Sequence, residues 1–514
     1  MATDPNGAVP NVEGPDAETG VAGALDDLVV VSNREPYQHR YTEEAGVVVD
    51  TPVGGLTGGL DRVMRRTDGT WIAWGDSDAD PSVVNAADCV RVPPGDPSYT
   101  LRRVWLGEDA VREYYYGFSN QVLWPLCHGL HGKAEFDRAF WERYRDVNAH
   151  FAETVAEHVE PGSTVWFQDY HLALAPRMVR QSLPAGTPLV QFWHIPWPEA
   201  DTFRACPEGE ALLDGLLGTD VLGFHVPEYC RNFLDCVARE LPGATVDRDA
   251  GEVVYDGHRT RVRAFPMGVD AERIGDVSAN TPDGFWESFR REHGVVGSTV
   301  AVGVDRLDYT KGIPERLDAL ERFWERNPEW RGELTYVQKA TESRSAIPAY
   351  QRLGTEVRDG VERVNDRFGT DEWTPVVYLE EHLSDADLYG LYRHSDLALV
   401  TPVRDGMNLV AKEYVAAQPT TPGEAGVLLL SALAGADDDL GDDALTVHPS
   451  DTDGFADAIG EAVSMPDHDR DRRMCRLRST VRTNDLDAWM GDVFAAVEGV
   501  RDGVGSVGTG DTAD

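Results

Sequence analysis

The stretch from Thr401 to Tyr414 has residue types and spacing that suit the binding of an anion. It follows the apolar run 396–400, which has the length and composition of a buried strand. Asp405 and Gly406 then break the chain before a run of helix formers. A strand, a glycine turn and a helix leave free N–H groups at the helix N-terminus, which favour a phosphate. Glu413, almost two turns further on, could reach the hydroxyls of a ribose. A plain strand-turn-helix unit without a ligand explains the same pattern.

A second candidate for phosphate chemistry is the loop after the predicted strand Thr299–Val304. It carries Arg306 and Lys311, a pair of cations suited to a diphosphate, with the arginine able to bind bidentately. A pair of surface charges is the alternative. The chain has only four lysines, Lys133, Lys311, Lys339 and Lys412. Three of them fall in or beside candidate motifs, which argues against a merely solvating role. After the next predicted strand, Lys339 and Arg344 form a candidate second phosphate site.

Polar residues also follow the predicted strands of the first half, and ligands of open α/β sheets bind at these strand ends. Arg34 follows the first strand, Asp169 follows Thr164–Gln168, and His194 follows Leu189–Trp193. A lone histidine in such a place is more often structural. The glycine-rich loop Gly54–Gly59, after which a helix is predicted from Leu60, lacks the spacings of dinucleotide-binding and nucleoside-triphosphate-binding loops.

Short apolar runs alternate with amphipathic segments between two polar ends, and most runs are continuous, as in buried parallel strands. The predicted strands are Leu28–Ser32, Thr164–Gln168, Leu189–Trp193, Val221–His225, Val262–Pro266, Thr299–Val304, Leu334–Gln338, Val376–Leu379, Leu397–Thr401, Val427–Ser431 and Leu445–His448. Helices are predicted over Glu135–Val155, Tyr229–Glu240 and Pro314–Arg326. The fold class is therefore α/β with two doubly wound domains, divided near Met267–Gly284, and a ligand cleft between them.

The composition limits the kinds of partner. A net charge of −42 makes nucleic acid and anionic membranes unsuitable partners. The preference for arginine over lysine on an acidic background indicates adaptation to concentrated salt. Scattered cysteines without a CxxC pair, no apolar run of 18 residues and no charged leader predict a soluble cytoplasmic protein. Asp-x-Asp triplets such as Asp76 and Asp78 are expected from so many acidic residues, and they predict no metal site.

Taken together, the motifs resemble those of the trehalose-6-phosphate synthase family, retaining glycosyltransferases of the GT-B fold. The resemblance covers roughly residues 28–497. The pieces that carry it are Val30–Arg34, Glu113–Tyr115, Phe118–Asn120, Val122–Pro125, Asp169–His171, His194–Pro196, Arg306–Tyr309 with Lys311 and Gly312, and Thr401–Gln418.

The resemblance implies two substrates, glucose 6-phosphate as acceptor and a nucleotide-glucose as donor, with α,α-trehalose 6-phosphate as product. UDP-glucose is the favoured donor, but the sequence leaves GDP and ADP open. The implied acceptor residues are Arg34, Tyr115 and Arg344 around the phosphate, with Trp74, Trp124 and Asp169 around the sugar. The implied donor residues are Gly55, His194, Arg306, Lys311, Asp405, the amides of Gly406, Met407, Asn408 and Leu409, and Glu413.

The implied catalytic residues are Asp169, His194, Arg306, Lys311 and Asp405. Cations and helix-terminal amides would stabilise the departing diphosphate, so neither a metal nor another cofactor is expected. Same-face attack, with the leaving phosphate accepting the proton, requires no nucleophilic carboxylate.

The implied organisation is an acidic disordered tail (1–27), an acceptor-binding Rossmann-like domain (28–270), a nucleotide-sugar-binding Rossmann-like domain (271–480), a helix packing back on the first domain (481–501) and a second tail (502–514). A homo-oligomer is left open. So are another phosphorylated acceptor and a silent sugar-phosphate-binding subunit. An insertion before the glycine loop makes Gly55 the least secure donor residue. Glu342, beside the expected acceptor phosphate, should weaken binding at low salt.

Overall fold

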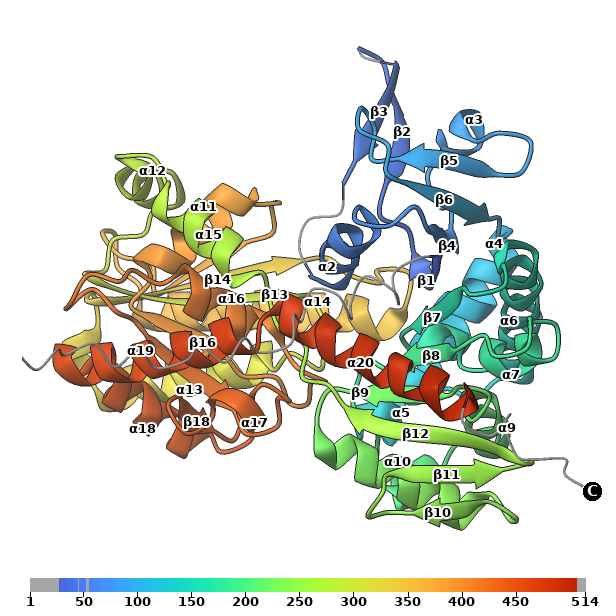
Figure 1. Cartoon of the computed structure of the whole chain (residues 1–514). Helices are drawn as coiled ribbons and strands as arrows, with labels where there is room; N and C mark the ends of the chain where they lie inside the picture. Colours follow the sequence, from blue (N-terminus) through green and yellow to red (C-terminus); the bar gives the residue numbers. More distant parts are fainter. Residues whose placement is uncertain (1–26, 45, 52–54, 506–514) are drawn as a thin grey trace, which may run out of the picture.

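The structure, a computed structural model, describes residues 27–44, 46–51 and 55–505. Figure 1 shows two lobes, one built on a ten-stranded sheet and the other on a six-stranded sheet. A separate two-stranded hairpin joins β2 (Gln38–Thr42) to β3 (Gly46–Asp50). The predicted tails lie almost wholly outside the described residues. Two α/β domains are present, as the pattern of apolar runs predicts.

The first sheet has the strand order β10-β11-β12-β9-β8-β7-β1-β4-β6-β5. Its strands are β1 (Leu28–Arg34), β4 (Thr70–Trp74), β5 (Cys89–Val92), β6 (Tyr99–Val104), β7 (Thr164–Gln168), β8 (Leu189–Phe192), β9 (Val221–Phe224), β10 (Thr245–Asp247), β11 (Glu252–Tyr255) and β12 (His258–Ala264). Strands β12 to β6 in this order are parallel, and antiparallel strands extend both edges. From β1 the chain first builds outward through β4 and β6, then returns to β7 on the other side of β1. The gap between β1 and β7 is therefore a topological switch point, where such sheets bind ligands.

The second sheet is wholly parallel, in the order β15-β14-β13-β16-β17-β18. Its strands are β13 (Thr299–Arg306), β14 (Leu334–Thr341), β15 (Val376–Leu379), β16 (Leu397–Val400), β17 (Val427–Ser431) and β18 (Leu445–Val447). Here the switch point lies between β13 and β16. The sequence predicts one strand for each of these, and every predicted strand of the chain is present, with ends that differ by up to four residues.

Successive side chains along a strand point to opposite faces of the sheet. The core of each domain therefore consists of two layers, one on each face of its sheet. Val29 and Val31 of β1 belong to one buried cluster, and Leu28 and Val30 belong to another on the opposite face. The second sheet is covered in the same way, by clusters containing Val300 and Ala301 respectively. Both faces of both sheets are thus buried, which explains the continuous apolar runs.

Helices cover these faces. In the first domain they are α2 (Gly55–Met64), α3 (Asp80–Val83), α4 (Glu108–Ala110), α5 (Trp124–Cys127), α6 (Arg138–His158), α7 (Ala175–Arg180), α8 (Ala200–Phe203), α9 (Gly209–Leu216) and α10 (Pro227–Glu240), with a π-helix, η1 (Val111–Leu123), and short 3₁₀ turns at His131–Lys133 and Tyr170–Leu172. In the second they are α11 (Ala271–Ala279), α12 (Phe285–His293), α13 (Ile313–Arg326), α14 (Pro348–Phe368), α15 (Asp385–His394), α16 (Leu409–Ala417), α17 (Asp437–Leu440), α18 (Thr452–Val463) and α19 (Asp467–Thr483), with a 3₁₀ turn at Pro328–Trp330. None of the described helices is both long and apolar enough to cross a bilayer.

The last helix, α20 (Leu486–Gly505), leaves the second domain and lies along the first (Figure 1, red). Its Trp489, Met490 and Phe494 belong to the cluster that buries one face of the ten-stranded sheet. Near its end, Arg501 donates hydrogen bonds to Gly162 O and Thr164 Oγ1, both at 2.8 Å. The helix continues to Gly505, so the predicted tail 502–514 begins too early; residues 506–514 lie outside the described part.

Two further helix starts differ from the sequence prediction. The helix after the glycine loop begins at Gly55 and not at Leu60, although residues 52–54 of the loop lie outside the described residues. The helix expected from Met407 begins at Leu409, because Asn408 adopts a left-handed conformation (φ 78°). Asp451 caps α18 by accepting a hydrogen bond from Gly454 N.

Candidate active site

A cavity of about 400 Å³ lies between the two switch points and contains residues of both domains. Arg34 ends β1, Asp169 follows β7 and Arg306 ends β13, so the strand-end rule brings all three to one place. The lining residues are Asn33, Arg34, Tyr115, Tyr116, Trp124, Asp169, Tyr170, His171, Arg306, Glu342, Ser343 and Arg344. Most residues predicted for the acceptor are among them. Trp74 does not line the cavity, but its ring lies 5.8 Å from that of Tyr115.

Arg34 stands at one end of this cavity. Its Nη1 pairs with Asp76 Oδ2 at 2.8 Å, and its Nη2 donates to the Tyr115 hydroxyl at 2.9 Å. The guanidinium carbon lies 5.8 Å from the centre of the Trp74 ring. Tyr115 itself projects from the wide π-helix η1, and the neighbouring cations lower the pKa of its buried hydroxyl despite the opposing effect of burial. A π-helix in this place fits a functional role, since such segments are frequent at sites.

Arg344 enters the cavity from the second domain. Its side chain is buried, pairs with Asp308 Oδ2 at 2.8 Å and donates to the Tyr350 hydroxyl at 2.7 Å. It reaches the first domain as well, with Nη2 3.2 Å from the Tyr170 hydroxyl and the guanidinium carbon 3.9 Å from the centre of the Trp124 ring. Its backbone is left-handed (φ 51°), a strained conformation that a functional position can justify.

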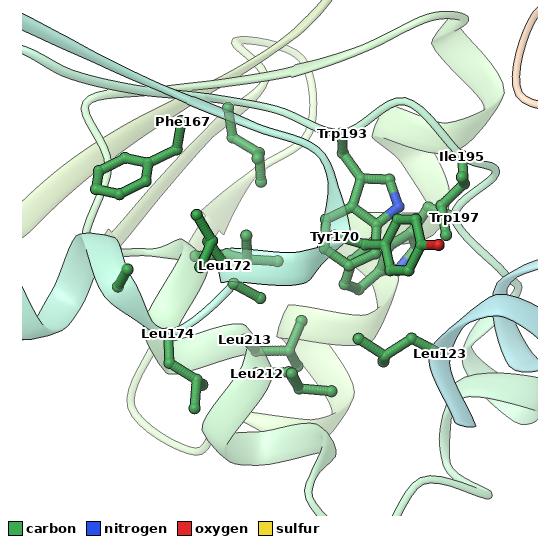
Figure 2. Close-up of a cluster of buried hydrophobic side chains, with 14 of the residues drawn as sticks. Leu123, Phe167, Tyr170, Leu172, Leu174, Trp193, Ile195, Trp197, Leu212 and Leu213 are labelled. Atoms are coloured by element: carbon green, nitrogen blue, oxygen red, sulfur yellow. The ribbon is translucent and has the colours of Figure 1, made fainter. Parts of the chain in front are cut away.

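Asp169 sits at the end of β7 with φ 67° and ψ −175°, a backbone conformation that is rare outside glycine. Burial raises the pKa of its carboxyl to about 7. Its buried Oδ1 has no hydrogen-bond partner, so the site presents an unused acceptor atom to a ligand hydroxyl. Figure 2 shows the apolar cluster that contains Tyr170, whose ring centre lies 6.2 Å from that of Trp193, and Trp193 in turn lies 4.9 Å from Trp197.

The end of β13 and the loop after it carry two cations expected to bind the donor, Arg306 and Lys311, and they differ in their partners. Arg306 makes no ion pair within the part of the chain that the structure describes, and its guanidinium lies 5.9 Å from the centre of the Trp124 ring. Lys311 Nζ is 2.5 Å from Asp405 Oδ2. Burial opposes ionisation of Asp405, but Lys311 outweighs it and lowers the pKa of this carboxyl. A bound diphosphate would therefore compete with Asp405 for Lys311.

The loop that holds Asp405 touches the first domain. Tyr229 of α10 donates to Asp405 O at 3.0 Å. A Cβ added to Gly406 would lie 2.2 Å from His194 O, so only glycine permits this approach. The His194 Nε2–H donates to Gln168 Oε1 at 2.9 Å, and burial lowers the pKa of its imidazole well below the usual value. A neutral histidine thus faces the donor loop.

Glu413 and Leu409 line a second cavity, of about 580 Å³, beside the linker between the domains. Burial, with a smaller effect of Asp385, raises the pKa of the Glu413 carboxyl to about 7. Helix α2 also lines this cavity, through residues that include Gly58, Gly59 and Arg62. The structure therefore brings Glu413 to helix α2, whose first residue is Gly55.

Several neighbours of the predicted site were not identified from the sequence. Asp308 and Tyr170 lie inside the quoted motifs, which could have signalled them. Asp76 was set aside as compositional, and Tyr229 has no local signal. The predicted second phosphate site is wrong for Lys339, which is buried and donates to Thr341 Oγ1, whereas Arg344 does line the cavity.

Arg404 and Lys412, for which the sequence indicates no role, have contacts here. Lys412 is buried, donates to Met267 O of the linker at 2.9 Å and pairs with Asp439 at 2.6 Å. The Lys412 side chain therefore connects α16 to the linker by a hydrogen bond. Arg404 lies 3.9 Å from Glu228 of the first domain.

Three carboxylates of the described residues, Glu35, Asp76 and Asp80, have oxygens within 4.8 Å of one another. Arginines already face them: Arg103 pairs with Glu35 at 2.7 Å and with Asp80 at 2.9 Å. Arg34 pairs with Asp76. Cationic partners thus compensate this cluster, and it needs no metal ion to balance its charge.

Two doubly wound domains that face each other across a cleft, with cations and carboxylates at both switch points, are the arrangement of a GT-B glycosyltransferase. The model of glycosyltransferase family 20 matches residues 26–498, and the chain belongs to this family. The resemblance inferred from the motifs is therefore confirmed.

Curated relatives carry names consistent with this family. The chain is 36% identical over 481 residues to the UDP-forming α,α-trehalose-phosphate synthase of Botryotinia fuckeliana, which covers 92% of this chain and 88% of the relative. It is also 36% identical over 473 residues to a bifunctional trehalose-6-phosphate synthase/phosphatase of Thermoproteus tenax, which covers 90% of this chain but only 62% of that protein.

Solved structures agree with the fold. The E. coli protein bound with UDP-2-fluoro glucose superposes with a TM-score of 0.81 at 33% identity, covering 92% of this chain and 98% of that one. The Burkholderia xenovorans α,α-trehalose-phosphate synthase in complex with glucose-6-phosphate superposes with a TM-score of 0.80 at 31% identity, covering 92% of this chain and 100% of that one. The predicted pair of Rossmann-like domains is thereby confirmed.

Proposed function

We propose that this chain transfers glucose from UDP-glucose to glucose 6-phosphate with retention, giving α,α-trehalose 6-phosphate. The observation that carries the proposal is the cavity at the two switch points, where Arg34 and Arg344 converge from different domains beside Asp169. Two arginines suit a phosphate dianion, and the unused Asp169 Oδ1 suits a sugar hydroxyl. The UDP-forming name of a relative and the ligands of two related structures support these substrates.

The residues in and beside the acceptor cavity are assigned the following roles in binding. Arg34, Tyr115 and Arg344 hold the acceptor phosphate, while Trp74, Trp124 and Asp169 shape the sugar site. Arg306 lines the acceptor cavity from the end of β13, so it can bind the diphosphate next to the reacting glucose.

On the donor side, Lys311 leaves Asp405 for the diphosphate, and this frees the Asp405 carboxylate for a hydroxyl of the transferred glucose. His194 and the amides of Gly406 to Leu409 bind the same sugar. Glu413 accepts from the ribose hydroxyls, and Gly55 at the start of α2 closes over the donor.

Catalysis would rest on stabilising the charge that develops as UDP departs. Arg306 and Lys311 bring positive charge to the leaving phosphate, where it matters more in the transition state than in the ground state. The acceptor hydroxyl attacks from the same face, and the leaving phosphate takes its proton. No residue is assigned as a nucleophile or as a general base.

We further propose that the enzyme is metal-independent, because Arg306 and Lys311 supply the positive charge for the leaving group. Activity should survive prolonged incubation with excess EDTA. Loss of activity that Mg²⁺ restores would contradict this.

We also propose a salt-adapted cytoplasmic protein with no membrane or nucleic-acid partner. The acidic composition and the free cysteines support this proposal. For the domain organisation, we propose the limits 28–270 and 271–480.

The test of the function is an assay of glucose 6-phosphate with UDP-glucose, GDP-glucose and ADP-glucose in molar KCl, with the product identified by NMR. An α,α-linked disaccharide phosphate formed fastest with UDP-glucose is expected. A product from a different phosphorylated acceptor, or binding of glucose 6-phosphate without turnover of any donor, would overturn the proposal.

A further inference from the structure

The two arginines of the acceptor cavity are held in the same way although they come from different domains. Each pairs with a carboxylate at 2.8 Å, Arg34 with Asp76 and Arg344 with Asp308. Each also donates to a tyrosine hydroxyl and lies near a tryptophan ring. A carboxylate, a phenol and an aromatic face together fix the position and the plane of a guanidinium.

Asp76 is itself anchored to the fold. Its Oδ1 accepts from Gln38 Nε2 at 2.5 Å, and its backbone N–H points to Glu35 Oε1 at 3.5 Å. Glu35 in turn pairs with the fully buried Arg103, which also holds Asp80. The carboxylate that contacts Arg34 is thus attached to a buried network of charges.

Arg34 needs such support more than Arg344 does. Its side chain is 50% exposed, whereas that of Arg344 is 5% exposed and packed on Trp124. An exposed arginine loses considerable rotamer entropy when it is fixed in one position. Asp76 binds Nη1 while Tyr115 binds Nη2, so the two partners hold opposite ends of the guanidinium.

We propose that Asp76 is a positioning residue for the acceptor phosphate, which it serves by fixing the Arg34 guanidinium in the cavity. This rests on the proposed function, because it takes Arg34 to be a phosphate ligand. Asp76 does not line the acceptor cavity, so we expect it to act through Arg34 and not by direct contact with the substrate. Its effect is therefore confined to acceptor binding and does not extend to the donor.

The opposite effect is also conceivable on charge alone, since a carboxylate near a phosphate dianion repels it. The contacts favour positioning, because both oxygens of Asp76 are engaged, one by Arg34 and one by Gln38. The two effects predict opposite changes in KM when Asp76 is removed.

The experiment compares Asp76→Ala with a matched control, Asp78→Ala, by steady-state kinetics. Asp78 is an exposed carboxylate on the same loop, and its Oδ1 accepts from Tyr41 N at 3.1 Å without touching Arg34. We expect Asp76→Ala to raise the KM for glucose 6-phosphate about tenfold, with kcat and the KM for the donor changed less than about twofold. Asp76→Glu should recover part of the affinity, and Asp78→Ala should resemble the wild type.

A double-mutant cycle with Arg34→Ala separates positioning from a general structural effect. If Asp76 acts through Arg34, adding Asp76→Ala to Arg34→Ala should change the KM for glucose 6-phosphate less than about twofold. An equal loss in both backgrounds, an unchanged KM or a lowered KM in Asp76→Ala would overturn the inference. Failure of the proposed function is distinguishable, because the wild type itself would then form no disaccharide phosphate.

Discussion

Lys311 is the residue whose partner must change when the donor binds. Its ammonium lies 2.5 Å from Asp405, and a diphosphate would replace that carboxylate. Lys311→Ala should lower kcat/KM by ~1.5–3 kcal/mol, the scale of a hydrogen bond between charged groups. Lys133→Ala is the control, because Lys133 is exposed and lies over the Tyr309 ring at 5.1 Å. Wild-type turnover in Lys311→Ala would contradict the diphosphate role.

Glu413 gives a prediction in which stability and function move in opposite directions. Burial raises the pKa of its carboxyl to about 7, above the ordinary value of 4.5. Folding therefore disfavours the carboxylate, and this cost is present at pH 8, falls as the pH decreases below about 7 and is lost below 4.5. Glu413→Gln should raise the melting temperature at pH 8 and change it little at about pH 4.

The same substitution should raise the KM for the nucleotide-glucose, because an amide accepts ribose hydroxyls less strongly than a carboxylate does. In the wild type this KM should rise as the pH falls through about 7, and the rise should be absent in Glu413→Gln. Equal pH profiles for the two proteins would rule out titration of Glu413 as the cause.

The sequence predicts side chains at strand ends well, because a strand fixes where its last residue points. Arg34, Asp169 and Arg306 meet at the switch points for this reason. It misses partners that a distant loop supplies. Asp76 reaches Arg34 across 42 positions, and Tyr229 reaches Asp405 across 176. Contacts between residues so far apart in the chain leave no pattern in the local sequence.

At the scale of elements, most parallel strands could be predicted, including the edge strands β15 and β18, whereas β4, β6 and the antiparallel strands β5, β10 and β11 could not. β7, β15 and β17 have the predicted limits, since their apolar runs are continuous. β6 contains two consecutive arginines, and β10 has three residues, of which two are exposed. Such strands are defined by pairing with neighbours and not by their own composition.

Helix α20 should contribute to the stability of the first domain, although it follows the second domain in sequence. Trp489 is buried against Trp166, with ring centres 5.4 Å apart. Trp489→Ala should lower the free energy of unfolding by about 3–5 kcal/mol, the usual cost of removing a buried tryptophan. Urea denaturation measures this, with the exposed Asp492→Ala as the control. A loss below about 1 kcal/mol would show that the helix is dispensable for the domain.

At the scale of the whole molecule, charge repulsion should dominate the response to salt. The net charge is −42, and the distance over which charges act falls from about 10 Å at 0.1 M salt to about 3 Å at 1 M. The melting temperature should therefore rise between 0.1 and 1 M KCl, by about 2–4 °C for each kcal/mol gained. Scanning fluorimetry measures this. A melting temperature that stays constant or falls would contradict salt adaptation.

The scarcity of lysine has a practical consequence for experiments on domain closure. Lys339 and Lys412 are buried and the side chain of Lys311 is 13% exposed, whereas Lys133 is exposed. An amine-reactive dye should therefore label Lys133 in preference to the other lysines. Lys133 belongs to the first domain and touches Tyr309 of the second. A fluorophore there would report, without an engineered cysteine, whether the two domains separate when the product leaves.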